Sequence, residues 1–240
     1  MSNLILIRHG QSTWNIENRF TGWVDVNLSK KGAEEAERSG KLINSLNLDL
    51  NIYFTSYLQR ATKTLDIILK IIRANNPKII KAWELNERHY GSLTGLNKDE
   101  VRKKLGENQV KNFRRSWSMS PPPMTKDNKY NVENDSIYKK INKKKIPTSE
   151  SLKDTYDRVV PYFEKEIWPL IIKKNNVLIS AHGNSLRALC KKIFTISDEK
   201  ITELEIPTGN PLIINFKKNL EISNCEYLDR ERKKNIFFNE

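Results

Sequence analysis

Two of the three histidines in this chain stand at the ends of short apolar segments, and each is followed by a glycine. One sequence reads Arg8-His9-Gly10 after Leu-Ile-Leu-Ile, and the other reads His182-Gly183 after Val-Leu-Ile-Ser-Ala. The carboxyl ends of parallel strands meet at the edge of a sheet where ligands bind, so we expect both imidazoles to face one pocket. An imidazole in such a place can act as a nucleophile or as a metal ligand.

Arginines near these histidines favour phosphate chemistry over metal binding. Arg8 directly precedes His9, and Arg60 opens a predicted helix just after the apolar segment 52–55. Positive charge beside an imidazole opposes the binding of a cation, so we expect no metal. Arginine side chains, free amides at helix N-termini and a histidine nucleophile are instead the parts of a site for a phosphoryl group.

A phosphoryl-transfer site also needs a group that gives and takes the proton of the substrate oxygen. Glu84 and Glu87 both follow the apolar segment 79–82, which places a carboxylate at a further strand end. Burial would raise the pKa of such a carboxyl group, and nearby arginines would lower it. Spacing alone leaves both glutamates open as candidates.

Short apolar segments rich in β-forming residues alternate with helical patterns along the chain. The predicted strands are residues 4–7, 52–55, 79–82, 177–181 and 212–216. Apolar residues recur at helical spacing between them, most clearly over 184–194, and Ser29 is placed to cap the first long helix. Nearly continuous apolar strands between helices predict an α/β fold with a mostly parallel central sheet and helices on both faces.

A length of 240 residues fits one α/β domain, which we expect to span residues 1–240. Residues from about 90 to 149 break the alternation with short helices, a Pro-Pro-Pro loop and a basic stretch, which predicts an inserted capping segment over the end of the sheet. Within it, Asn97 to Glu100 matches a helix N-cap pattern, and Gly106 suits a helix end. A long helix is predicted over 151–174, bent or broken at Pro161.

Longer motifs around these residues resemble a known family. The stretch 8–12 (Arg-His-Gly-Gln-Ser) is similar to the signature of the histidine phosphatase superfamily. Further stretches resemble the 2,3-bisphosphoglycerate-dependent phosphoglycerate mutases within that superfamily: residues 15–23, 85–91, 95–98, 114–115, 121–123 and 181–187. The resemblance runs in order from about Leu4 to Phe216. It implies a phosphoglycerate mutase-like fold and phosphoryl transfer between the 3- and 2-hydroxyls of glycerate.

The same resemblance implies roles for individual residues. His9 would carry the phosphoryl group, and Glu87 would be the general acid and base. Arg8, Arg60 and His182 would hold the transferred group. The residues implied to bind substrate are Gly10, Gln11, Ser12, Asn15, Thr21, Gly22, Arg88, His89, Tyr90, Lys98, Arg114, Arg115, Gly183 and Asn184. The implied cofactor is 2,3-bisphosphoglycerate, which primes His9, and the implied assembly is a homodimer or homotetramer.

Two other activities of the superfamily stay open as alternatives. A phosphatase would use the same His9 and let water take the phosphoryl group, and a bisphosphoglycerate mutase would release the bisphosphate. The long insertion with its paired Arg114 and Arg115 favours the phosphoglycerate mutase over a simple phosphatase.

A few positions depart from the family pattern. Gln11 stands where the family usually has glutamate, and Asn210 stands where a small apolar residue is common. The stretch 227–230 (Tyr-Leu-Asp-Arg) lacks the glycine that usually follows Tyr-Leu, and the end of the chain is short and basic. The tail is therefore where this chain diverges most. In the family this tail helps to cover the active site.

A formal net charge of +13 raises the alternative of a nucleic-acid-binding protein. Lysines are scattered, however, and the densest runs, 139–145 and 230–234, lie in segments expected to be exposed. We therefore expect small phosphoglycerate anions as partners and no nucleic acid. No segment approaches the roughly 18 apolar residues of a membrane span, and the first residues read as a buried strand and not as a signal peptide. Cys190 and Cys225 form no disulfide or metal pattern, so a cytoplasmic location is expected.

Overall fold

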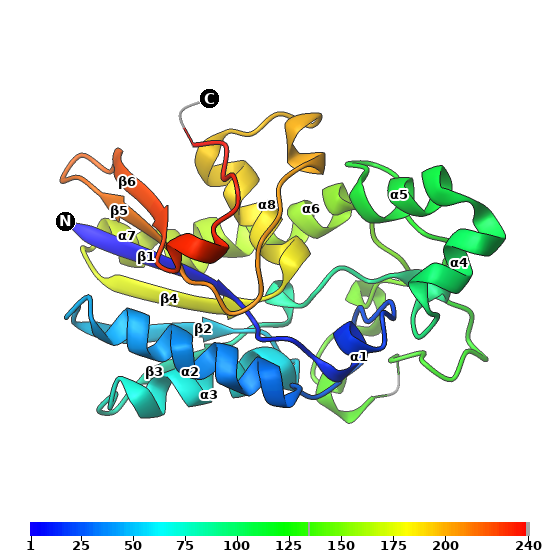
Figure 1. Ribbon diagram of the computed structural model, residues 1–240, viewed down its shortest axis with the longest axis horizontal. Helices are drawn as coiled ribbons and strands as arrows, with labels where there is room; N and C mark the ends of the chain where they lie inside the picture. The colour runs from blue at the N-terminus through cyan, green and yellow to red at the C-terminus, as the bar shows by residue number, and fades with distance from the viewer. Residues whose placement is uncertain (134, 239–240) are drawn as a thin grey trace.

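A six-stranded sheet forms the centre of the protein, seen in a computed structural model that describes residues 1–133 and 135–238 (Figure 1). The strand order is β3-β2-β4-β1-β5-β6. The strands are β1 (Ser2–Arg8), β2 (Leu50–Thr55), β3 (Lys78–Lys81), β4 (Asn176–Ala181), β5 (Leu212–Phe216) and β6 (Ile222–Tyr227). Strands β3, β2, β4 and β1 pair in parallel, whereas β5 pairs antiparallel with both β1 and β6. The mostly parallel sheet predicted from the apolar segments is confirmed.

All five predicted strands are present within two residues of their expected limits, but β6 was not predicted. It is the last strand of the sheet, and Ser223 and Asn224 within it are exposed. An edge strand that buries little surface needs few apolar residues, so its sequence carries no strong strand pattern.

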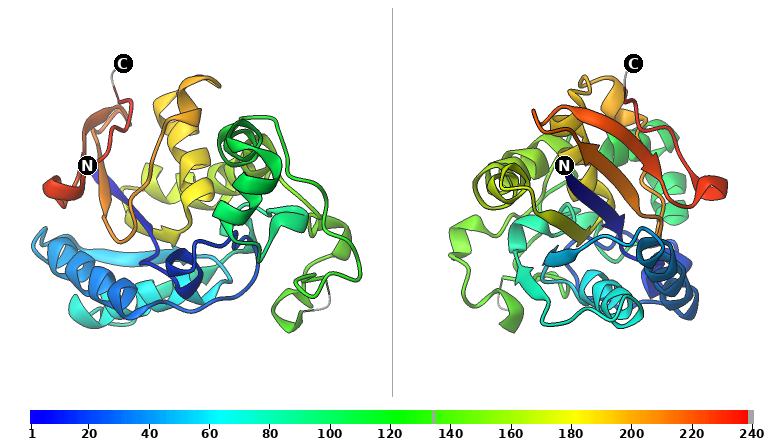
Figure 2. Two further views of the ribbon diagram at one scale, coloured as in Figure 1. Left: turned by 45° about the vertical axis from the view of Figure 1, so that its right-hand side comes forward. Right: turned by 90° about the vertical axis from the view of Figure 1, so that its left-hand side faces the viewer.

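Helices cover both faces of the sheet (Figure 2). Those packed on it are α2 (Lys30–Asn44), α3 (Gln59–Ile71), α6 (Leu152–Tyr162), α7 (Trp168–Ile172) and α8 (Gly183–Phe194). Alternate residues of β1 separate the two sides, since successive side chains of a strand point to opposite faces. Leu4 and Leu6 join the core formed with α6, α7 and α8, whereas Ile5 and Ile7 join the core formed with α2 and α3. Ser29 caps α2 as predicted, accepting the N–H of Gly32.

The helix predicted over 151–174 is interrupted beyond its proline. Helix α6 includes Pro161 and ends at Tyr162, a π-helical turn follows over Phe163–Ile167, and α7 continues from there. Proline has no N–H for the helical ladder, so regular α-helix is not maintained past it. The expected break is therefore present, as a π-helical turn.

Residues 91–149 extend beyond the end of the sheet at which β1, β2 and β4 finish (green in Figure 1). The segment contains α4 (Lys98–Leu105) and α5 (Glu107–Arg115), while a short α1 (Thr13–Ile16) lies earlier in the chain. Asn97 caps α4, and Gly106 ends it with a φ of 86°. Val101 and Phe113 from these helices pack with Phe20 in a small core of their own. Among the described residues, no helix is long and apolar enough to cross a membrane.

Candidate active site

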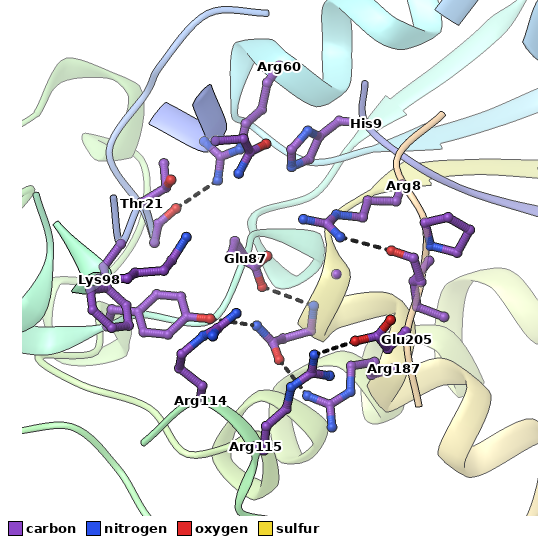
Figure 3. Close-up of a pocket in the computed structure, with 18 of the residues that line it drawn as sticks. Arg8, His9, Thr21, Arg60, Glu87, Lys98, Arg114, Arg115, Arg187 and Glu205 are labelled. Carbon is purple, nitrogen blue, oxygen red and sulfur yellow. Dashed lines mark hydrogen bonds and ion pairs between the residues drawn. The ribbon is translucent and has the colours of Figure 1, made fainter. Parts of the chain in front are cut away.

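A cavity of about 330 Å³ opens at the end of the sheet where β1 and β4 finish (Figure 3). Strand β1 delivers Arg8 and His9 to it, and the first turn of α8 delivers Gly183 and Asn184. Arg60 comes from the first turn of α3. These elements begin or end at the same edge because their strands are parallel neighbours, which is the convergence predicted for the strand ends.

His9 and His182 lie against each other at this edge. Their ring centroids are 5.0 Å apart with the planes at 60°, and both side chains are buried. His9 Nδ1 is 2.7 Å from the carbonyl oxygen of Gly10. A carbonyl can only accept, so Nδ1 carries the proton and Nε2 keeps its lone pair.

Burial and two arginines keep His9 neutral. Burial lowers the pKa of His9 well below its usual value, and the charges of Arg60 and Arg8 lower the pKa further. A neutral imidazole with a free Nε2 is the nucleophilic form of histidine.

His182 is held in place by Ser56. Its Nε2 shares a hydrogen bond of 2.7 Å with Ser56 Oγ, and the N–H of Leu58 donates to the same oxygen. Burial lowers the pKa of His182 well below its usual value, with Arg60 and His9 adding to the effect. Within the described part of the chain, the buried Nδ1 of His182 has no hydrogen-bond partner.

Two arginines near His9 are fixed by main-chain carbonyls. Arg60 donates from Nη2 to Gly22 (2.8 Å) and from Nη1 to Val24 (3.0 Å). Arg8 donates from Nη1 to the carbonyl of Ile206 at 2.9 Å. Burial lowers the pKa of Arg60 to about 10, so its guanidinium is still charged at neutral pH. Both cations are thus rigidly placed for an anion beside His9.

The two candidate glutamates lie in different surroundings. Glu87 lines the cavity, and its Oε1 accepts the main-chain N–H of Asn184 at 3.0 Å and of Arg88 at 2.8 Å. Figure 3 shows Glu87 between His9 and Arg60 on one side and Arg114 on the other. Glu84 is not among the lining residues, and burial raises its pKa.

The wall opposite His9 is also cationic. Lys98, Arg114 and Arg115 line it with Tyr90, and burial lowers the pKa of both Lys98 and Arg114. Arg88 lies behind this wall, with its Cζ 4.7 Å from the centre of the Tyr90 ring. Burial raises the pKa of Tyr90, but the charges of Arg88 and Arg114 outweigh it and bring the pKa down to about 8.

Most of the residues singled out in the sequence line this cavity, and some do not. Those that line it are Arg8, His9, Asn15, Thr21, Gly22, Arg60, Glu87, Tyr90, Lys98, Arg114, Arg115, Gly183 and Asn184. Those outside the lining are Gly10, Gln11, Ser12, Arg88, His89 and His182, although His182 touches His9.

Three of the residues outside the lining make contacts that stabilise local structure. Gln11 donates its N–H to Glu35 Oε2 at 2.8 Å, and Ser12 caps α1. His89 accepts the N–H of Gly91 on Nδ1, and burial lowers its pKa to about 4. The structure therefore does not bring the Gln11, Ser12 or His89 side chains to the cavity.

Several lining residues were not predicted from the sequence: Arg19, Phe20, Arg187, Leu204, Glu205, Ile206, Pro207 and Lys234. Arg187 follows Gly183 by one helical turn, and that spacing could have indicated it. Glu205 and Lys234 lie in loops without a local pattern, so only the folded chain identifies them.

Positive charge dominates the lining. Eight basic side chains and two carboxylates line the cavity, namely Arg8, Arg19, Arg60, Lys98, Arg114, Arg115, Arg187 and Lys234 against Glu87 and Glu205. Over residues 1–133 and 135–238, no group of three or more His, Cys, Asp or Glu side chains is arranged to hold a metal ion. The arrangement suits a small, multiply charged anion whose phosphoryl group meets His9.

Comparison with known sequences gives a family and close relatives. The family model of the histidine phosphatase superfamily (branch 1) matches residues 4–222. A protein of Pelagibacter ubique is 50% identical over 236 residues, covering 98% of this chain and 99% of its own length. A protein of Hydrogenobaculum is 48% identical over 231 residues, covering 96% and 94% of the two chains. Both are named 2,3-bisphosphoglycerate-dependent phosphoglycerate mutase.

Solved structures share the fold at low sequence identity. A mycobacterial glucosyl-3-phosphoglycerate phosphatase has a TM-score of 0.69 at 18% identity, covering 95% of this chain and 97% of its own. Bacillus stearothermophilus YhfR has a TM-score of 0.69 at 22% identity, covering 93% and 96% of the two chains. The chain belongs to the histidine phosphatase superfamily and, within it, to the family of the 2,3-bisphosphoglycerate-dependent phosphoglycerate mutases.

Proposed function

We propose that this protein interconverts 3-phosphoglycerate and 2-phosphoglycerate, and that His9 carries the phosphoryl group between the two positions. One observation carries the proposal: a buried, neutral imidazole with its Nε2 unprotonated lies beside two fixed arginines in a strongly cationic cavity. The names of the relatives support the same activity.

In the proposed reaction, phosphorylated His9 gives its phosphoryl group to the 2-hydroxyl of bound 3-phosphoglycerate, so the P–N bond breaks and a new P–O bond forms. Glu87 takes the proton of that hydroxyl. After the bound bisphosphate has reoriented, Nε2 of His9 attacks the phosphorus at the 3-position, so the P–N bond forms again and the P–O bond there breaks. Glu87 gives its proton to the leaving oxygen, and 2-phosphoglycerate is released. Arg8, Arg60 and His182 hold the charge of the transferred group throughout.

The lining fits 2,3-bisphosphoglycerate as the cofactor. Buried guanidinium N–H groups without a partner in the described part of the chain include Arg8 Nε and Arg187 Nε, which line the cavity, and Arg88 Nε and Nη1 just behind it. Such groups call for an anion with several oxygens. When bound, 2,3-bisphosphoglycerate supplies the phosphoryl group that primes His9. Its second phosphate and its carboxylate would meet the cationic wall of Lys98, Arg114 and Arg115.

The remaining substrate contacts follow from position in the cavity. Asn15 and the amides of Gly183 and Asn184 would complete the phosphoryl subsite near His9. Thr21, Gly22 and Tyr90 would position the glycerate carbon chain and its carboxylate.

We also infer one domain over residues 1–240, with about 90–149 as its capping insertion. The contribution of Arg114 and Arg115 from this segment to the cavity supports the capping role. Resemblance to the family supports a homodimer or homotetramer. It also supports a cytoplasmic location and a function without metal, nucleic acid or membrane.

The test is a coupled assay together with phosphoryl labelling. The protein should convert 3-phosphoglycerate, and a trace of 2,3-bisphosphoglycerate should raise the rate. Labelled 2,3-bisphosphoglycerate should leave an acid-labile, base-stable phosphoryl group on His9. His9→Ala should lose the label and the turnover while melting cooperatively.

Retention of the label by His9→Ala, or loss of wild-type activity in EDTA, would exclude the proposed mechanism. Release of inorganic phosphate without formation of 2-phosphoglycerate would indicate the phosphatase instead. Accumulation of free bisphosphate would indicate the bisphosphoglycerate mutase.

A further inference from the structure

Two positions that depart from the family pattern, Asn210 and Asp229, contact each other. Asn210 Nδ2 donates to the carbonyl of Asp229 at 3.0 Å, and the N–H of Asp229 donates to Asn210 Oδ1 at 3.1 Å. The carboxylate of Asp229 is 1% exposed and pairs with Arg38 at 3.0 Å and Arg232 at 2.7 Å. The divergent tail is therefore anchored where it begins.

Arg232 provides a second anchor, which ties the tail to the turn after His9. Its Nη2 donates to the carbonyl of Gly209 at 2.9 Å, and its Nη1 lies 3.6 Å from Glu35 Oε1. The other oxygen of Glu35 accepts the main-chain N–H of Gln11 at 2.8 Å. One buried carboxylate thus contacts both the nucleophile turn and the tail.

Lys234 lies between the Arg232 anchor and a third anchor. This third anchor consists of Ile236 and Phe237, which pack against the main core. Lys234 lines the cavity, and its Nζ lies 3.5 Å from Glu205 Oε2. The tail thus adds a cation to the site, and its position is fixed on both sides.

Glu205 is a carboxylate in a cavity that is otherwise suited to anions. Its Oε1 lies 2.8 Å from Arg115 Nη2, so it neutralises one cation from α5 and one from the tail. Burial raises the pKa of Glu205, but Arg115 and Lys234 outweigh it and hold the pKa below its usual value. The side chain is therefore charged at neutral pH and competes with any anion for these two cations.

We infer that Lys234 is a substrate-binding residue, and that Glu205 occupies Arg115 and Lys234 until the anionic groups of the substrate displace it. The inference rests on the proposed function for the identity of the substrate. Lys234 adds attraction for the phosphoglycerate. Glu205 weakens binding, because its contacts with both cations must be given up.

The experiment compares Lys234→Met with Lys233→Met, since Lys233 is exposed and does not line the cavity. Lys234→Met should raise the KM for 3-phosphoglycerate by about two- to fivefold, the range for a partly exposed ion pair. Glu205→Gln should lower the KM by about the same factor. Both effects should shrink as salt is added, and kcat should change little. Lys233→Met should behave as the wild type.

Equal KM values for Lys234→Met and Lys233→Met would overturn the inference, and so would a KM for Glu205→Gln that stays unchanged or rises. Thermal melting identifies a variant that fails to fold, and Lys234→Gln then replaces Lys234→Met. If the wild type turns over no phosphoglycerate, the proposed function fails. In that case, calorimetry with 2,3-bisphosphoglycerate should show weaker binding for Lys234→Met, tighter binding for Glu205→Gln and unchanged binding for Lys233→Met. Absence of binding there overturns both proposals.

Discussion

At the scale of single residues, the proton carrier can be tested by comparing Glu87 with Glu84. Glu87→Gln keeps an oxygen that can accept the N–H groups of Asn184 and Arg88, but it removes the transferable proton. A positioned general acid contributes about 10²- to 10⁴-fold, so kcat should fall by about that factor while KM changes little. Steady-state kinetics measure both quantities.

Glu84→Gln is the matched control, because Glu84 follows the same strand outside the cavity. It should reduce kcat by less than about tenfold. A large loss at Glu84 with a mild one at Glu87 would reverse the assignment, and His9 could still be the nucleophile.

Tyr90 should make substrate binding dependent on pH. Its hydroxyl is neutral below its pKa of about 8 and negative above it. A phenolate in the cationic wall repels an anionic substrate, so the KM for 3-phosphoglycerate should rise as the pH passes upward through about 8. Tyr90→Phe cannot ionise and should lack this rise. The same rise in wild type and Tyr90→Phe would assign it to another group.

At the scale of elements, α2 packs closely against the turn after His9. A Cβ on Gly10 would lie 2.1 Å from the carbonyl oxygen of Gly32, closer than any real contact. The two glycines therefore let the helix approach the nucleophile turn. Glu35 on α2 then reaches the N–H of Gln11 and, on the other side, Arg232 of the tail.

Deleting the tail from Arg230 onward should leave a folded protein, because β5, β6 and the Asn210–Asp229 contacts are retained. The deletion removes Lys234 and the apolar contacts of Ile236 and Phe237, so the melting temperature should fall modestly. Water should then reach the phosphohistidine more easily, and mutase turnover should fall relative to hydrolysis.

The ratio of 2-phosphoglycerate formed to phosphate released measures this effect of the tail deletion. Lys234→Met serves as the control that removes the cation and keeps the rest of the tail. An unchanged ratio after the deletion would show that the tail does not keep water from the site.

At the scale of the whole molecule, the positive charge falls into two classes. The lysines within 139–145 are exposed and do not line the cavity. The cavity lining contains eight basic residues and two carboxylates, and this excess of positive charge attracts an anionic substrate. Exposed lysines and cavity cations therefore make separate contributions to the net charge of +13.

This charge arrangement predicts that phosphoglycerate binding weakens with salt. The KM for 3-phosphoglycerate should rise steadily as KCl increases from about 0.05 to 0.5 M, over which screening lengths shorten severalfold. The kcat should change less, because the groups around His9 are buried and poorly screened. A KM independent of salt would contradict the role given to the cationic lining.

Patterns in the amino-acid sequence predict the first five strands of this protein and their order, but not the edge strand β6. Nearly continuous apolar segments and a capping serine are local patterns, and the five predicted strands and the cap at Ser29 form where they are expected. The proximity of His9 and His182 could also be predicted, because each follows a strand and parallel strands bring their carboxyl ends to one edge. Pro161 indicated a break through its missing N–H.

The tertiary structure selects which side chains share the cavity. It separated Glu87 from Glu84, directed Gln11 and His89 to other contacts, and brought Glu205 to Arg115 across 90 residues of sequence. It also paired Asn210 with Asp229, which the sequence showed only as separate departures. Such contacts depend on how segments far apart in the chain pack together, and the local spacing of residues carries no record of that packing.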